Sequence, residues 1–162
     1  MASISYRGSE DRLRQALRQL PAVLAGRAPD PYGVGRRVRE RVADELLRLV
    51  RENFLSKSVG GAGADGVAWE PLSTKTLSRR GLRRGILMAT GELLAGIVVE
   101  ARGNRLEVRA TSKPWHHTGV VGRLPARPFW PGRLPASWQE RLLRVMAEAV
   151  AAAVAELARR EG

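Results

Sequence analysis

The adjacent histidines His116 and His117 are the residues whose type most directly suggests a metal site. Adjacent side chains diverge on a helix and point to opposite faces of a strand, so a shared ion would need acidic ligands close by. No aspartate or glutamate lies between Glu107 and Glu140. We therefore predict a structural or interface role for this pair, with no metal and no cofactor.

The patterns that usually mark an active site are missing from the sequence. The chain has no cysteine, no G-x-S-x-G turn for a nucleophilic serine, no Walker loop, no G-x-G-x-x-G that follows a strand and no zinc-ligand spacing. The carboxylates Glu70 and Glu92 stand apart from other acids, and Glu92 fits the first turn of a helix, where the macrodipole favours a negative charge. The sequence therefore predicts a protein that is not an enzyme and has no catalytic residues.

The chain is strongly basic, with 28 Lys+Arg against 16 Asp+Glu and a formal net charge of +12. Its densest basic group is formed by Arg79, Arg80, Arg83 and Arg84. Arginine binds phosphate and carboxylate groups bidentately, so this group could contact DNA or an acidic partner. Elsewhere the basic residues are interleaved with acids, and neither stacking aromatics nor a helix-turn-helix pattern accompanies them. A small basic DNA-binding protein is therefore our alternative hypothesis, and a solvated helix face is the simpler explanation.

Three of the four tryptophans lie in segments without regular periodicity. Trp69, Trp115 and Trp130 are each within two residues of a proline, whereas Trp138 falls in an expected C-terminal helix. Large aromatic side chains on irregular segments often anchor interfaces, and they can equally pin a loop onto the core. The pattern alone leaves both interpretations open.

The periodicity of apolar residues predicts a single α+β domain over residues 1–162. Helices are expected over residues 9–25, 36–54 and 136–160, with short helices over 74–80 and 91–96. Alternation predicts a hairpin around a Gly103-Asn104 turn, with Ile97, Val99 and Ala101 facing Leu106, Val108 and Ala110. The fold class is thus a small antiparallel sheet or hairpin packed with two to three longer helices, including N-terminal and C-terminal ones.

Two segments are expected to lack regular structure. The glycine-rich composition of residues 56–68 predicts a flexible loop. Residues 111–135 are predicted to form an irregular arm that is stiffened by proline. The N-terminus lacks the apolar stretch of a signal peptide, and no apolar run is long enough to span a bilayer. We therefore expect no membrane association and a location inside the cell during synthesis.

The order of several short motifs is more specific than any one of them. Asn53-Phe54 and a glycine-rich loop precede DGVAWEPLSTKT (65–76), RR (79–80), ILMATGELLAGI (86–97), the hairpin, HHTG (116–119) and LPARPFW (124–130), which are followed by the last helix. Over residues 50–160 this series resembles the phage virion-morphogenesis family of tail-completion proteins. The sequence departs from the family pattern at Gly96, where serine is usual, and at Thr118, where an aromatic residue is usual.

The resemblance implies a structural protein of the virion tail or neck, assembled in the host cytoplasm. Such a protein acts by docking onto other phage neck or tail proteins, and we expect a homo-oligomeric ring, which requires heterologous interfaces. In this setting the arginine group would face an acidic neighbour or make non-specific contact with the genome DNA. We assign the partner interface to Trp69, Trp115, His116, Arg127, Phe129 and Trp130. Core packing is the alternative for Phe129 and Trp130.

Overall fold

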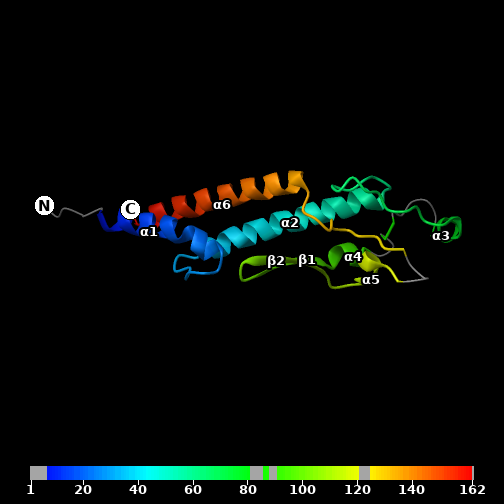
Figure 1. Ribbon diagram of the computed structural model, residues 1–162, viewed down its shortest axis with the longest axis horizontal. Coiled ribbons are helices and arrows are strands. Elements are labelled where there is room, and N and C mark those ends of the chain that lie inside the picture. Colours follow the sequence, from blue (N-terminus) through cyan, green and yellow to red (C-terminus); the bar gives the residue numbers. More distant parts are fainter. Residues whose placement is uncertain (1–6, 81–85, 88–90, 121–124, 162) are drawn as a thin grey trace.

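The fold is α+β, with a two-stranded antiparallel hairpin packed against long helices. The computed structural model describes residues 7–80, 86–87, 91–120 and 125–161. Its elements in chain order are α1 (Arg7–Leu24), α2 (Val34–Ser58), α3 (Thr74–Arg80), α4 (Glu92–Ala95), β1 (Ile97–Arg102), β2 (Arg105–Ala110), α5 (Trp115–Thr118) and α6 (Ala136–Glu161). Helix α2 lies between α6 on one side and the hairpin on the other (Figure 1).

The hairpin has the predicted pairing. Ile97 pairs with Ala110, Val99 with Val108 and Ala101 with Leu106, so the alternating apolar residues share one face of the sheet. The turn residue Gly103 has a φ of 59°, a conformation that glycine adopts without steric cost. This apolar face covers one side of α2, and Ile97 is completely buried there.

Helix α2 supplies the core along its whole length. Its N-terminal half packs Val34 and Val38 against Ala149 and Ala153 of α6, in a cluster that also takes in the last turns of α1. Its C-terminal half forms a second, larger cluster with the hairpin, with Trp138 of α6 and with the segments that follow α2 and the hairpin. The apolar repeat in residues 136–160 predicts an inward stripe on α6, and its members are buried or half-buried: Leu142, Val145, Met146, Ala149, Ala153 and Leu157.

Ion pairs support the packing of α2 on α6. Arg141 Nε lies 2.7 Å from Glu45 Oε1, and Arg37 Nη1 lies 2.6 Å from Glu156 Oε2. Hydrogen bonds from Arg48 and Arg141 lower the pKa of Glu45 to about 2, although its burial alone would raise it. Glu45 therefore stays ionised and ties the middle of α2 to the first turns of α6.

Three predicted details differ from the structure. Helix α2 continues to Ser58, so residues 56–58 are helical, although we placed them in the flexible loop. The apolar repeat in residues 9–25 predicts that Leu17 lies on the same packed face as Leu20, but Leu17 is 42 % exposed, and the described packing of α1 comes from Leu20, Val23 and Leu24. The sequence places Thr90 where it could cap the short helix over 91–96, but Gly91 is the N-cap residue of α4, with a φ of 74°, and Thr90 lies outside the described residues. Of Ser73 and Thr74, the two residues that could cap the helix expected over 74–80, Ser73 is the one that caps α3, accepting from Thr76 N at 3.3 Å.

Candidate functional site

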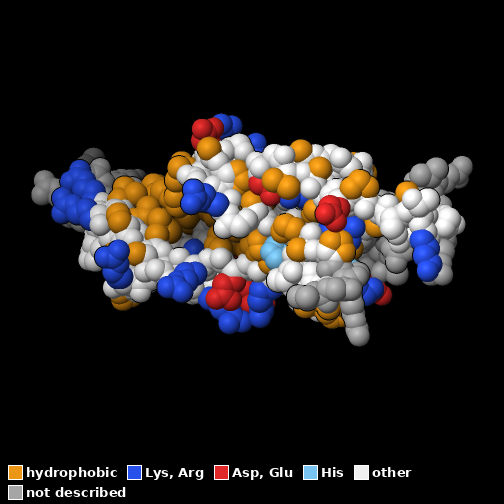
Figure 2. All heavy atoms as spheres, turned by 45° about the vertical axis from the view of Figure 1, so that its right-hand side comes forward, with side chains coloured by type: hydrophobic (Ala, Val, Ile, Leu, Met, Phe, Trp, Pro, Cys, Tyr) orange, Lys and Arg blue, Asp and Glu red, His pale blue; other side chains and the backbone are white. Residues whose placement is uncertain are grey.

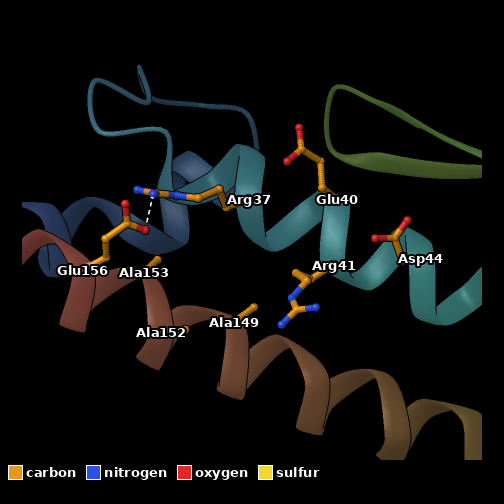
Figure 3. A pocket seen from close by; sticks show the side chains of 8 residues that line it. All are labelled: Arg37, Glu40, Arg41, Asp44, Ala149, Ala152, Ala153 and Glu156. Carbon is orange, nitrogen blue, oxygen red and sulfur yellow. Dashed lines mark hydrogen bonds and ion pairs between the residues drawn. The ribbon is translucent and has the colours of Figure 1, made fainter.

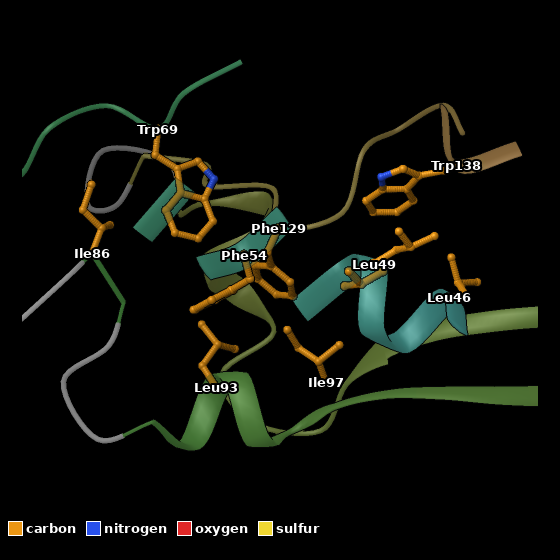
Figure 4. Close-up of a cluster of buried hydrophobic side chains, with 10 residues drawn as sticks. Leu46, Leu49, Phe54, Trp69, Ile86, Leu93, Ile97, Phe129 and Trp138 are labelled. Atoms are coloured by element: carbon orange, nitrogen blue, oxygen red, sulfur yellow. The ribbon is translucent and has the colours of Figure 1, made fainter. Parts of the chain in front are cut away.

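Residues from separate motifs meet around the C-terminal half of α2. The ring of Phe54 lies 5.3 Å from that of Trp69 and 5.9 Å from that of Phe129, both in edge-to-face geometry. Leu93 and Ile97 lie beneath these rings and Ile86 lies beside Trp69 (Figure 4). The irregular arm therefore returns to the core and places Phe129 at its centre.

Buried polar side chains fix the arm at this point. Asn53 Nδ2 donates to the carbonyl oxygen of Phe129 at 2.9 Å, and Trp69 Nε1 donates to that of Pro128 at 3.0 Å. Lys57 Nζ also donates to the Pro128 carbonyl, at 3.4 Å. We call the five residues Asn53, Lys57, Trp69, Pro128 and Phe129 the arm anchor.

Two side chains of the arm anchor also hold the loop that follows α2. Asn53 Oδ1 accepts from Ala64 N at 2.7 Å, and Lys57 Nζ pairs with Asp65 Oδ2 at 2.9 Å. Burial alone would raise the pKa of the Asp65 carboxyl, but hydrogen bonds from Lys57 and from Val67 N lower it below its usual value. The loop and the arm are therefore fastened to α2 through the same two residues.

Helix α5 lies within the arm, and His116 and His117 join it to the later part of the arm. Arg127 N donates to the His116 carbonyl at 2.9 Å, and Phe129 N donates to His117 Nδ1 at 3.3 Å. The imidazole of His117 stacks on Trp130, with ring centroids 4.0 Å apart. Burial lowers the pKa of His117, and the nearby charge of Lys57 lowers it further.

This environment predicts a loss of stability in mild acid. The folded-state pKa of His117 is below its usual value of 6.5, so the unfolded chain binds more protons as the pH falls. The contribution of His117 is fully present above 6.5 and is lost as the pH falls toward the lower folded-state pKa. Urea titrations between about pH 7.5 and about pH 5 should show this fall, with Asp65 still ionised across the range.

The matched variants for this measurement are His117→Gln and His116→Gln. Glutamine at position 117 removes the titrating group, so most of the pH dependence in this range should disappear. His116→Gln should keep it, because this change leaves the His117 imidazole and the backbone carbonyl of residue 116 in place. An equal pH dependence in the wild type and in His117→Gln would show that another group is responsible.

Arg127 is buried within the chain, with 7 % of its surface exposed. Its Nη2 donates to the Glu70 carbonyl at 3.3 Å, and no acceptor among the described residues reaches its buried Nε. Burial lowers the pKa of its guanidinium, whereas the charge of Glu70 raises it. Arg127 therefore links the arm to the segment before α3.

The predicted interface residues fall into two groups. Trp69, Arg127 and Phe129 are buried by the chain itself in the folded monomer, and their assignment to a partner interface stays a prediction. The physical reason for their burial is that the arm folds back onto α2 instead of projecting from it. Trp130 and His116 are half-buried, whereas Trp115 is 48 % exposed on α5.

The arginine group is placed only in part. The backbone of Arg79 and Arg80 belongs to the last turn of α3, but their side chains are outside the described residues, as are Arg83 and Arg84. Their contact with phosphate groups or an acidic partner stays a prediction. Sequence reasoning missed Asn53 and Lys57 as anchoring residues, and the only available signal was the position of Asn53 beside Phe54 in the motif series.

A groove between α2 and α6 is a second candidate site (Figure 3). Its floor is formed by Ala149, Ala152 and Ala153 of α6, and charged residues of α2 line its wall. Arg37 and Glu156 pair across it. The charged residues that line the groove have both signs: Arg37, Glu40, Arg41 and Asp44 on α2 and Glu156 on α6. This mixed lining does not select a ligand of one charge.

No group of three or more His, Cys, Asp or Glu residues is arranged to hold a metal ion in the part of the chain that the structure describes. Among the same residues, no helix is both long enough and apolar enough to cross a membrane. Comparisons with protein-family models, with curated proteins and with solved structures found no match to this chain.

Proposed function

We propose that this chain is a structural assembly protein of a tailed bacteriophage or prophage. It acts in tail completion or head–tail joining by docking onto neck or tail proteins, as one subunit of a ring. The observation that carries the proposal is the meeting of the motif residues in one cluster: Phe54, Trp69, Ile86, Leu93, Ile97 and Phe129. Motifs that together build one core support a shared fold better than a chance similarity of short segments would.

The exposed Trp115 is the docking residue that we propose. It lies on α5, whose turn is closed by Gly119 N donating to the Trp115 carbonyl at 2.8 Å. The stacking of His117 on Trp130 and the bond between Arg127 N and His116 O hold α5 against the arm. A large aromatic side chain on a fixed turn loses little conformational entropy on binding, which favours its use as an interface anchor.

The test of the function uses the phage or prophage that encodes the chain. A stop codon early in the gene should give lysates in which heads and tails accumulate unjoined, counted by negative-stain electron microscopy. Addition of the purified protein should restore joined, infectious particles. Normal numbers of infectious particles without the chain would overturn the proposal. DNA affinity at about 0.15 M salt that depends on Arg79, Arg80, Arg83 and Arg84 would instead favour the DNA-binding function.

The Trp115→Ala variant should restore particles at least about tenfold less efficiently than the wild type. This is the effect expected when an interface anchor that contributes about 1.4 kcal/mol or more to the binding free energy is lost. Its melting temperature should change little, because the side chain is half exposed. Leu17→Ala is the matched control, since Leu17 is 42 % exposed on α1. If Trp115→Ala and Leu17→Ala restore joined particles equally well, Trp115 is not part of the partner interface.

A further inference from the structure

The outer edge of β2 has no partner strand in the part of the chain that the structure describes. Thr111 N donates to the Gly96 carbonyl at 2.8 Å just beyond the hairpin, so every second residue counted back from Thr111 bonds to β1. The backbone N–H and C=O groups of Leu106, Val108 and Ala110 therefore point away from β1. No backbone hydrogen bond joins these three residues to another described segment. Such a row of unpaired backbone groups is a template for a further strand.

The apolar face of β2 is also incompletely covered. Helix α2 packs chiefly on β1, so β2 is the outer strand of the hairpin. Leu106, Val108 and Ala110 are half-buried, whereas Ile97 on β1 is completely buried. A strand added at this edge would extend the hydrogen-bond ladder and cover these three side chains at the same time.

The opposite, exposed face of β2 determines which strand fits. Its charges alternate in sign from Arg105 through Glu107 to Arg109. Figure 2 shows acidic and basic side chains next to one another on the lower side of the molecule, where Figure 1 places the hairpin. The side chains of Glu107 and Arg109 are 42 % and 45 % exposed, and each pairs with a residue of β1 on its own chain, Arg102 and Glu100 respectively. Both keep room for a second partner of opposite charge beyond the outer edge.

A second copy of β2 has the charges that this edge needs. If two β2 strands pair antiparallel about a two-fold axis at Val108, Glu107 of each copy faces Arg109 of the other. An axis at Glu107 would instead place this carboxylate against its own counterpart, and an axis at Arg109 would do the same with two guanidinium groups. The register centred on Val108 therefore uses the whole strand and joins only opposite charges.

The same register fits the apolar face and the backbone. Val108 faces its own counterpart, and Leu106 of each copy faces Ala110 of the other, so apolar side chains meet apolar side chains. These are also the residues whose backbone groups point outward, so they can exchange hydrogen bonds across the axis. A partner that carries charges of one sign, such as DNA, would not match the alternating charges of β2.

We propose that two copies of this chain pair through the outer edges of β2, antiparallel about a two-fold axis at Val108. The two hairpins, with two strands each, then form one continuous four-stranded sheet. This contact is isologous, so it differs from the heterologous contacts that close a ring, and it does not rest on the proposed function.

Sedimentation equilibrium of the full chain at about 0.15 M salt tests the interface. The wild type should show a concentration-dependent monomer–dimer equilibrium. Val108→Pro should raise the dimer dissociation constant about 100-fold or more, because proline removes an N–H at the outer edge but no bond to β1.

Val99→Pro is the matched control. Val99 faces Val108 within the hairpin and is also half-buried, but its N–H points toward the opposite edge of the sheet. Its dissociation constant should stay within about threefold of the wild type. Equal effects of the two proline variants would refute the proposal, since that is the result expected when β1 of one copy pairs with β2 of the next.

A charge exchange tests the register. Glu107→Arg and Arg109→Glu should each weaken the dimer at least about tenfold, and the double variant should restore it, because the exchanged charges again face each other across the axis. Arg105→Glu makes the same change in net charge as Arg109→Glu but faces no charged residue of the second copy, so it should have little effect.

Circular dichroism of each variant reports whether the fold is kept, and if a proline variant loses it, the charge exchange alone decides. A wild type that stays monomeric at every concentration measured, or a double variant that dissociates as readily as the two single variants, would also refute the pairing.

Discussion

Replacing Phe129 with alanine is expected to lower the free energy of unfolding by about 3–5 kcal/mol. Phe129 has no exposed surface, and its ring contacts those of Phe54, His117 and Trp130 at centroid distances of 5.9, 4.8 and 4.7 Å. Alanine would leave a cavity among side chains that three different segments contribute. Urea denaturation followed by circular dichroism measures this loss.

The control for this substitution is Trp115→Ala, which removes a larger aromatic side chain from an exposed position close by in the same arm. Its free energy of unfolding should change by only about 0.5 kcal/mol, as is usual for surface substitutions. The opposite result, with Phe129→Ala as stable as the wild type but unable to restore particles, would place Phe129 at the partner interface.

Replacing Asp65 with alanine is expected to destabilise the chain by about 3–5 kcal/mol. Asp65 lies in a surface loop and its side chain is 24 % exposed, but its partner Lys57 has no exposed surface. Without the carboxylate, the ammonium group of Lys57 stays buried with only the Pro128 carbonyl as a described acceptor. Thermal and urea unfolding both measure the effect.

A double variant separates the ion pair from the loop itself. Lys57→Met combined with Asp65→Ala should recover most of the lost stability, because no uncompensated charge is then buried. Val67→Ala is the neighbouring control, since Val67 is 55 % exposed in the same loop. If Asp65→Ala is no more harmful than Val67→Ala, then Lys57 is not held by this pair.

The elements with a clear apolar period could be predicted from the sequence. The alternation from Ile97 to Ala110 predicts the hairpin and its register, because only one register buries all six apolar residues on one face. The repeat in residues 136–160 predicts α6 in the same way, since its stripe must face a partner helix. In both cases the information is local in the chain.

The candidate site could be predicted only in part. The order of motifs indicated that Phe54, Trp69 and Phe129 belong together, but aromatic residues in irregular segments fit a core and an interface equally well. The burial of Lys57 could not be predicted, because lysine at the end of a helix is usually exposed. Its partners Asp65 and Pro128 lie 8 and 71 positions away along the chain, where no periodic pattern relates them.

The central position of α2 also determines when the chain can fold during its synthesis. The ion pair of Glu45 can form only after Arg141 has been synthesised. That of Arg37 needs Glu156, which is 119 positions further along the chain. Until α6 has left the ribosome, Val34 and Val38 of α2 lack their contacts with Ala149 and Ala153, so part of the apolar side of α2 is open to other molecules. The packing of α2 is therefore completed only after α6 has been synthesised, and it requires the closure of long loops, which costs entropy. In cells that overproduce the chain, aggregation of the nascent protein should compete with folding at this step.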